Sequence, residues 1–235
     1  DRRPIGGALV TNFASMRLGV ETACGQYSKF EGGPLAVRGD NIGLGWARMR
    51  DERGNLTEAF ELIEVGDDGR IVFHATFDEA DFENAYRELE SRYHSGEGTA
   101  FSEYSEFNSA YLIAMNRGDF DTMFNEMAWP DLRVENRSRS VFPDRSAEDL
   151  RRSFEELYAM LVSARSWFSA VHWLSPTINV GRLEREGLGR DGERYAWTRI
   201  LVNQYRDGRL ASICEFDAGD EDAALAYAEE LAAQT

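Results

Sequence analysis

The chain carries the same pattern twice in the same order: a turn, a strand, an acidic step and an amphipathic helix. The first occurrence, "DDGRIVFHATFDEADFENAYREL", starts at Asp67, and the second, "RDGRLASICEFDAGDEDAALAYAEEL", starts at Arg206. Each Asp-Gly-Arg triplet is a turn signal between two β-rich runs, which predicts a β-hairpin ahead of each helix. The repeated pattern therefore predicts an α+β protein with antiparallel sheets.

Both helices of this pattern are amphipathic. Phe82, Tyr86 and Leu89 recur at helical spacing in the first, and Ala224 and Ala228 do so in the second. Acidic residues gather in the first turn of each helix, where they interact favourably with the helix dipole. We expect each helix to bury one face.

The segment between the two copies has no counterpart ahead of the first one. It predicts a helix after Phe101, a shorter helix ended by Pro130, and a strand from Leu132. A third helix opens with a loose capping box formed by Ser146 and Asp149, and long strands follow. The second copy is therefore the more complete one.

Composition excludes several classes of partner and cofactor. The net charge of −16 would repel nucleic acid and anionic membranes, and no apolar run approaches the roughly 20 residues of a membrane helix. Two cysteines, Cys24 and Cys214, make neither a disulfide framework nor a metal site, so we expect both to be reduced and buried. These features favour a cytoplasmic protein with no cofactor and no metal.

The order of elements from Tyr104 to Asp217 resembles the nuclear transport factor 2-like superfamily, also called SnoaL-like or polyketide-cyclase-like. The stretch "MAWPDLRVENRSR" carries most of the resemblance, because it is similar to the family's short helix, Pro-Asp turn and first strand. The resemblance implies a cone-shaped, curved antiparallel sheet covered by helices, with a pocket inside the cone.

On this basis we interpret residues 97–235 as a complete domain of this type. Residues 1–96 are interpreted as a partial copy, consisting of the strand meander and the terminal helix. Tandem copies resemble the C-terminal regions of large actinobacterial regulatory proteins that carry ATP-binding modules, which implies a larger parent protein. The apolar face of the partial meander, which includes Ile71, Phe73 and Phe77, predicts packing against another sheet, within the chain or in a homodimer.

Strand alternation identifies the candidate pocket wall. Tyr195, Trp197, Arg199 and Leu201 share one face of a strand, and the apolar Leu201 indicates that this face is the enclosed one. A buried Arg199 would need an acidic partner, for which Glu135 and Glu215 on neighbouring strands are the candidates. The alternative is that Arg199 reaches solvent.

Candidate catalytic residues are spread over three predicted strands. Asp131, Glu135 and Arg137 resemble the acid-and-arginine sets of some family enzymes, and a solvated strand face is the alternative. His172 could be a general base, or a core or dimer-contact histidine; alternation places it on the face of Phe168, opposite Trp173. Glu215 is the remaining candidate base.

No catalytic set converges in the sequence, and the first copy is incomplete. These two features favour a non-catalytic module for small-molecule binding or association within a larger regulatory protein. The alternative is a SnoaL-like enzyme, a cyclase, isomerase or hydrolase acting on a small apolar substrate. A small apolar molecule is the candidate ligand for the binding module and for the enzyme.

Overall fold

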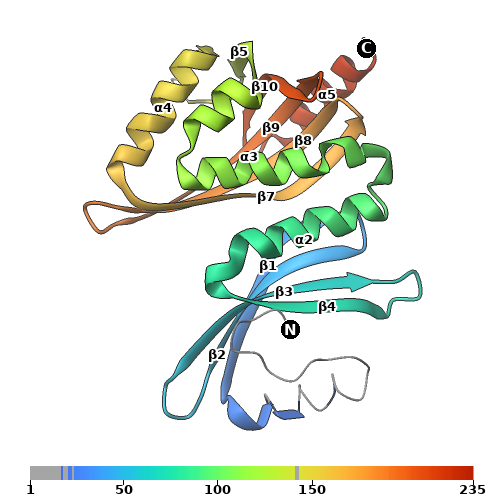
Figure 1. Ribbon diagram of the computed structural model, residues 1–235, viewed down its shortest axis with the longest axis vertical. Helices are drawn as coiled ribbons and strands as arrows, with labels where there is room; N and C mark the ends of the chain where they lie inside the picture. The colour runs from blue at the N-terminus through green and yellow to red at the C-terminus, as the bar shows by residue number, and fades with distance from the viewer. Residues whose placement is uncertain (1–16, 18–20, 23, 141–142, 235) are drawn as a thin grey trace. The chain divides into compact units, whose positions relative to one another are not determined.

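The computed structural model describes residues 17, 21–22, 24–140 and 143–234. It divides into two compact units, Asp1–Tyr93 and His94–Thr235 (Figure 1). Among the described residues, no helix is both long enough and apolar enough to cross a lipid bilayer.

The first unit contains a four-stranded antiparallel meander followed by a helix. Its elements are β1 (Lys29–Arg38), β2 (Ile42–Arg50), β3 (Leu56–Val65), β4 (Ile71–Asp78), the 3-10 turn η1 (Glu79–Asp81) and α2 (Phe82–Ser95). Gly69, with φ of 74°, provides the left-handed position that the hairpin between β3 and β4 requires. The predicted hairpin and helix are both present.

Helix α2 covers one face of this meander. The ring of Phe82 lies 5.4 Å from that of Phe60, and Phe77, the ladder partner of Phe60, is fully buried. The guanidinium of Arg92 lies 3.5 Å from the centre of the Phe73 ring. The chain's own helix thus covers Phe73 and Phe77, for which the sequence predicted a second sheet, and only Ile71 of the three is exposed.

A buried ion pair joins β1 to α2. Nη2 of Arg38 lies 2.5 Å from Oε1 of Glu90, and the two side chains are 1% and 2% exposed. Arg38 also donates a hydrogen bond to the hydroxyl of Tyr86. A paired and hydrogen-bonded charge is tolerated in a core, whereas breaking such a pair is strongly destabilising.

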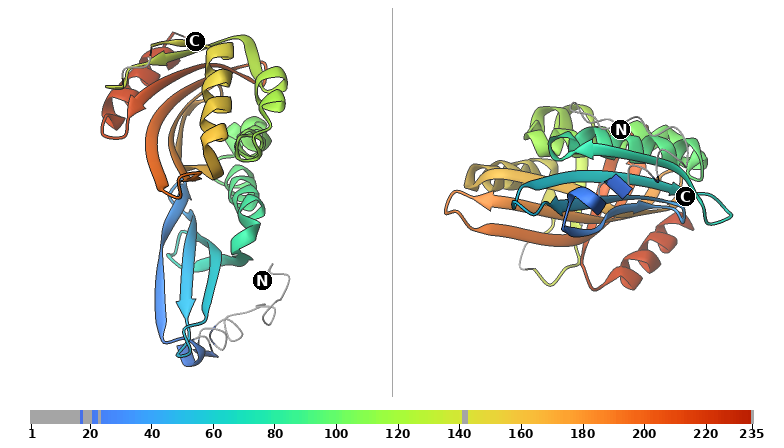
Figure 2. Two further views of the ribbon diagram at one scale, coloured as in Figure 1. Left: turned by 90° about the vertical axis from the view of Figure 1, so that its left-hand side faces the viewer. Right: turned by 90° about the horizontal axis from the view of Figure 1, so that it is seen from below.

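The second unit is built on a six-stranded sheet. Its elements are η2 (Thr99–Tyr104), α3 (Ser105–Arg117), η3 (Thr122–Glu126), β5 (Ala128–Asn136), β6 (Arg145–Ser146), α4 (Ala147–Met160), β7 (Leu161–Ser175), β8 (Ile178–Gly189), β9 (Arg194–Arg206), β10 (Arg209–Asp217) and α5 (Glu221–Ala232). The strand order is β6-β5-β10-β9-β8-β7, with β5 parallel to β10 and the other pairs antiparallel. The sheet is strongly curved (Figure 2), so the predicted α+β class with a curved, helix-covered antiparallel sheet is confirmed.

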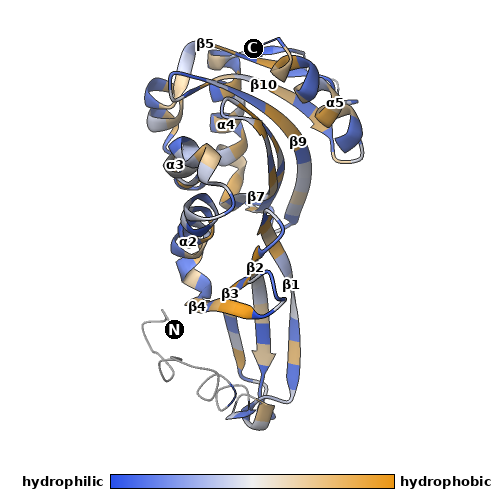
Figure 3. Ribbon diagram, turned by 90° about the vertical axis from the view of Figure 1, so that its right-hand side faces the viewer, coloured by the Kyte–Doolittle hydropathy of each residue, from blue (hydrophilic) through white to orange (hydrophobic). Residues whose placement is uncertain are grey.

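Helices cover both faces of the curved sheet. Ala224 and Ala228 of α5 pack against alternate residues of the strands, which form an apolar cluster of Ile178, Val180, Ile200, Val202, Cys214 and Phe216. Helices α3 and α4 lie over the opposite, inner face. Apolar positions, orange in Figure 3, occur on the strands and on the helices that cover them.

Three local details can be compared with the sequence predictions. The predicted short helix is a single π-helical turn, η3, and Pro130 lies inside β5. The capping box is complete, because Ser146 accepts a hydrogen bond from the backbone N–H of Asp149 and the Asp149 side chain accepts one in return. Cys214 is buried as predicted, but Cys24 is exposed, so the prediction of burial is wrong for Cys24.

Candidate ligand-binding site

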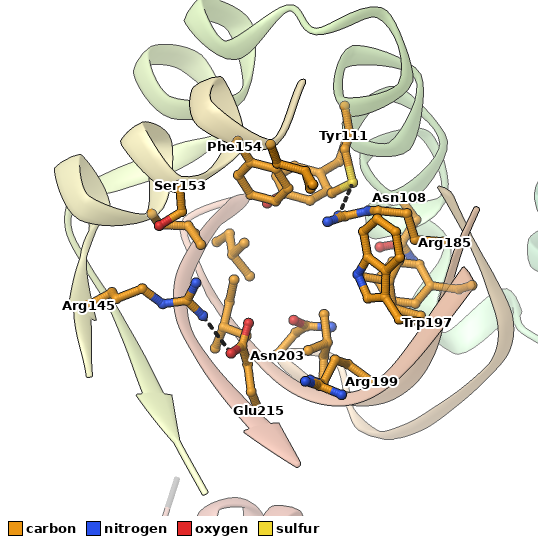
Figure 4. A pocket seen from close by; sticks show the side chains of 18 of the residues that line it. Asn108, Tyr111, Arg145, Ser153, Phe154, Arg185, Trp197, Arg199, Asn203 and Glu215 are labelled. Atoms are coloured by element: carbon orange, nitrogen blue, oxygen red, sulfur yellow. Dashed lines mark hydrogen bonds and ion pairs between the residues drawn. The ribbon is translucent and has the colours of Figure 1, made fainter. Parts of the chain in front are cut away.

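A cavity of about 450 Å³ lies between the inner face of the sheet and helices α3 and α4 (Figure 4). Most of its wall is apolar. The apolar side chains include Met115 of α3, Leu150 and Phe154 of α4, Phe168 of β7, and Trp197 and Leu201 of β9.

Strand alternation on β9 decides which side chains reach the cavity. Trp197, Arg199 and Leu201 line it, together with Asn203, whereas Ile200 between them packs under α5. Tyr195 is not among the lining residues. It lies beside the β8–β9 turn, where it is exposed and its hydroxyl donates a hydrogen bond to Asp191 over 2.6 Å.

Arg199 has a different acidic partner from those suggested by the sequence. Its Nη1 lies 3.8 Å from Oδ1 of Asp217, and its side chain is 32% exposed. Glu135 is hydrogen-bonded to Arg137, and Glu215 is paired with Arg145. Arg199 is therefore a partly solvated wall residue rather than a buried charge.

An ion pair between Glu215 and Arg145 forms a second polar region of the cavity. Oε2 of Glu215 on β10 lies 2.5 Å from Nη2 of Arg145 on the short strand β6, with the side chains 20% and 14% exposed. The complete capping box fixes Ser146, the residue after Arg145, at the start of α4. Glu215 is the one predicted catalytic residue that lines the cavity.

Arg185 of β8 is the third arginine of the wall and the most buried one, with 7% of the residue exposed. Its Nε donates a hydrogen bond to Oγ of Ser166 over 2.8 Å, and its Nη2 to Sδ of Met115 over 3.0 Å. Burial lowers the pKa of this guanidinium from its ordinary value, but arginine remains charged at any physiological pH.

A chain of amide and hydroxyl groups continues the polar part of the wall. Asn203 donates to Asn179, Asn179 donates to the hydroxyl of Tyr205, and this hydroxyl donates to Asn108 on α3. The Nδ2 atom of Asn108 has no hydrogen-bond partner among the described residues, although it is buried. Burial also raises the pKa of Tyr111, so this wall residue is neutral.

The other predicted catalytic residues lie away from the cavity. Asp131 forms an exposed ion pair with Arg206, as expected for a residue on a solvated strand face rather than in a catalytic site. Glu135 pairs with Cys214 across the sheet and accepts a hydrogen bond from Tyr227 of α5, and the Arg137 guanidinium lies 4.0 Å from the Tyr227 ring. These two residues therefore belong to the outer face of the sheet, under α5.

His172 is exposed and does not line the cavity. A register shift between Phe168 and Ala170 interrupts the alternation of β7. As a result, Phe168 lines the cavity while Trp173 lies on the same inner side, stacked against Tyr104. The predicted grouping of faces is wrong at this β-bulge, which adds one residue to the strand.

Sequence reasoning missed Arg185, Arg145 and Asn108. Arg185 lies in a run of alternating charges, "RLERE", which is typical of a solvated strand. The missing signal was the register of the β8–β9 hairpin, which places Arg185 directly opposite Trp197. Among the described residues, no group of three or more His, Cys, Asp or Glu is placed to hold a metal ion.

No family model and no curated protein matches the chain, but solved structures do. A putative polyketide cyclase from Xanthomonas campestris is 16% identical, with a TM-score of 0.41 over 52% of this chain and 95% of that one. A Mycobacterium tuberculosis LEH-like epoxide hydrolase is 17% identical, with a TM-score of 0.41 over 57% of this chain and 98% of that one. A Catenulispora acidiphila protein with a ketosteroid isomerase-like fold is 9% identical, with a TM-score of 0.39 over 46% of this chain and 81% of that one.

These likenesses concern the fold alone. The curved six-stranded sheet, with α3 and α4 over the inner face and α5 over the outer face, is the arrangement that the sequence resemblance implied. In this arrangement the second unit resembles the nuclear transport factor 2-like fold. The cavity of the second unit lies inside the cone that the curved sheet forms with helices α3 and α4.

Proposed function

We propose that the second unit is a non-catalytic binding module that holds one small, mainly apolar molecule inside its cone. The observation that supports this most is the cavity itself, which is enclosed between helices and sheet and has mostly apolar walls with a few polar groups. Its volume of about 450 Å³ lies within the range of roughly 300–1,000 Å³ that is usual for ligand pockets. We also propose, from the sequence resemblance, that the chain belongs to a larger regulatory protein.

Binding without chemistry is favoured by the groups that line the cavity. Among the described lining residues there is no histidine and no cysteine, and the carboxylates are Glu156 and Glu215. Glu215 is held by Arg145, and Glu156 is exposed on α4. General acid–base catalysis needs a positioned proton acceptor whose pKa suits the reaction, and this wall offers one candidate at most.

The second candidate function is a SnoaL-like enzyme, supported by the position of Glu215 inside the cavity. In that case Glu215 is the base, and Arg145 orients it and stabilises its charged form. The names of the solved relatives, a putative polyketide cyclase and an epoxide hydrolase, indicate reaction classes to assay. Turnover of a bound compound that disappears in Glu215→Gln supports the enzyme, whereas binding without turnover supports the binding module.

Binding can be tested with a neutral fluorescent probe, N-phenyl-1-naphthylamine, and the full chain. Ser153 of α4 is half-buried and lines the cavity, so Ser153→Trp fills the space from the helix side. The matched control is Ala159→Trp, on the exposed side of the same helix. We expect the wild type and Ala159→Trp to bind the probe with similar affinity and Ser153→Trp to bind it at least about tenfold more weakly, the equivalent of roughly 1.4 kcal/mol.

Equal probe affinity in the three proteins would contradict the proposed site, because binding would then occur elsewhere on the chain. Absence of probe fluorescence in the wild type, combined with no thermal shift for a panel of apolar acids, amides and alcohols, would contradict the proposed function as a whole.

A further inference from the structure

Arg185 is a buried cation for which the described part of the chain provides no carboxylate partner. No described Asp or Glu lies within ion-pair distance of it, in contrast to Arg145 and Arg199 of the same wall. Its two hydrogen bonds go to a hydroxyl and to a thioether sulfur, which are weak partners for a full positive charge. Its Nη1 donates no hydrogen bond to any residue that the structure describes.

Such an arrangement is costly in the unliganded protein. Buried charges are normally paired, because removing an ion from water costs more free energy than neutral hydrogen bonds return. The β8–β9 hairpin fixes the backbone of Arg185, because this residue lies directly opposite Trp197 in the ladder. A ligand anion would provide the missing partner.

Aromatic rings flank the guanidinium. Its carbon lies 4.9 Å from the centre of the Phe154 ring and 5.5 Å from that of Trp197, and it projects towards the cavity between them (Figure 4). The planar guanidinium matches a carboxylate in a two-point hydrogen bond, and its faces stack on rings. The adjoining rings would also contact an aromatic body attached to that carboxylate.

The charge of the wall fits an anion as well. The described lining residues include three arginines, Arg145, Arg185 and Arg199, and two glutamates, Glu156 and Glu215, in a chain whose net charge is −16. Arg145 is paired with Glu215 and Arg199 lies beside Asp217, so Arg185 is the arginine of this wall with no described carboxylate at ion-pair distance. Glu215 is neutralised by its ion pair with Arg145, so it does not oppose an anion near Arg185.

We propose that the ligand of this cavity is an aromatic or otherwise apolar monocarboxylic acid, with its carboxylate bound by Arg185. This inference rests on the proposed binding function and adds the chemical class of the ligand. The apolar body of the acid lies against Leu201 and the rings of Phe154 and Trp197.

The test compares two compounds of the same shape, 2-naphthoate and the neutral 2-naphthamide, in displacement of N-phenyl-1-naphthylamine from the full chain. We expect wild type to bind the naphthoate about tenfold or more tightly than the amide, as a charge-assisted hydrogen bond implies. Arg185→Met should abolish this preference, and Arg185→Lys should retain part of it. Arg182→Met is the matched control, because Arg182 lies on the other face of the same strand, paired with Glu184, and should keep the preference.

The outcomes separate the inference from the proposed function. Equal affinity for the two compounds in the wild type overturns the inference, while probe binding still supports the function. A preference that survives in Arg185→Met also overturns the inference. If Arg185→Met does not fold, the affinities for naphthoate and naphthamide in the wild type and in Arg185→Lys still test the inference. No probe binding to the wild type, together with no thermal shift by either compound, overturns the proposed function itself.

Discussion

At the scale of single residues, three arginines on one cavity wall differ in their partners. Arg199 is partly solvated beside Asp217, Arg145 is paired with Glu215, and Arg185 is buried with no described carboxylate at ion-pair distance. Substituting Arg145 and Arg185 by methionine should therefore have opposite effects on the unliganded protein.

For Arg185→Met we expect an increase of about 1–2 kcal/mol in the free energy of unfolding, because a lone buried charge is replaced by an apolar chain of similar length. Arg145→Met should lower it by about 2 kcal/mol, because Glu215 loses its partner. The loss expected for Arg145→Met is smaller than for a fully buried ion pair, because the Arg145 and Glu215 side chains are 14% and 20% exposed. Urea denaturation of both variants checks this prediction, and a loss of stability in Arg185→Met would contradict it.

At the scale of elements, the sequence predicts what local signals determine. The Asp207-Gly208 pair adopts φ values of 48° and 72°, the left-handed turn that its composition indicates. The capping box at Ser146 marks the start of α4, and residue spacing identifies the buried faces of α2 and α5. Two neighbouring residues or a regular period are enough to specify each of these features.

Features that depend on pairing between distant strands are not predictable in this way. The bulge in β7 has no Gly or Pro to mark it in "SWFSAVHWL", yet it moves Trp173 to the inner face. The parallel pairing of β5 with β10 joins strands that are separated in the chain by α4 and four other strands. That pairing places Glu135 beside Cys214 on the outer face, away from the cavity, although its charge suggested a site residue.

The candidate site is predictable only in part, because some of its residues follow from local alternation and others from pairing between strands. Alternation within β9 alone identifies Trp197, Arg199 and Leu201 as one face. Finding Arg185 requires the β8–β9 register, and finding Arg145 requires the position of β6 at the edge of the sheet. The residues that carry the charge of the site thus depend on tertiary structure.

At the scale of the whole molecule, the two units share one arrangement of hairpin and helix. Phe60 pairs with Phe77 under α2, and Ile200 pairs with Phe216 under α5. This correspondence supports the proposal that residues 1–96 are a partial copy of the domain at 97–235. Each unit has its own buried core, so we propose that each is a separate unit of folding.

Arg38→Met tests this independence. It removes the cation that forms the buried ion pair with Glu90 in the first unit, which should lower the stability of that unit by about 3–5 kcal/mol. Binding of N-phenyl-1-naphthylamine, which reports on the second unit, should be unchanged at temperatures where the first unit has melted. The double variant Arg38→Met/Glu90→Leu removes both charges and should recover much of the loss. Simultaneous loss of probe binding and of the first unit's structure would show that the units fold together.

A crystal structure of the full chain with 2-naphthoate would test directly whether Arg185 binds the carboxylate of a ligand in the cavity. We expect electron density for the naphthyl rings between α4 and the inner face of the sheet. The carboxylate oxygens should lie about 2.7–2.9 Å from the Arg185 guanidinium nitrogens, the length of a charge-assisted hydrogen bond. An empty cavity at saturating ligand, or naphthoate bound with its carboxylate away from Arg185, would contradict it.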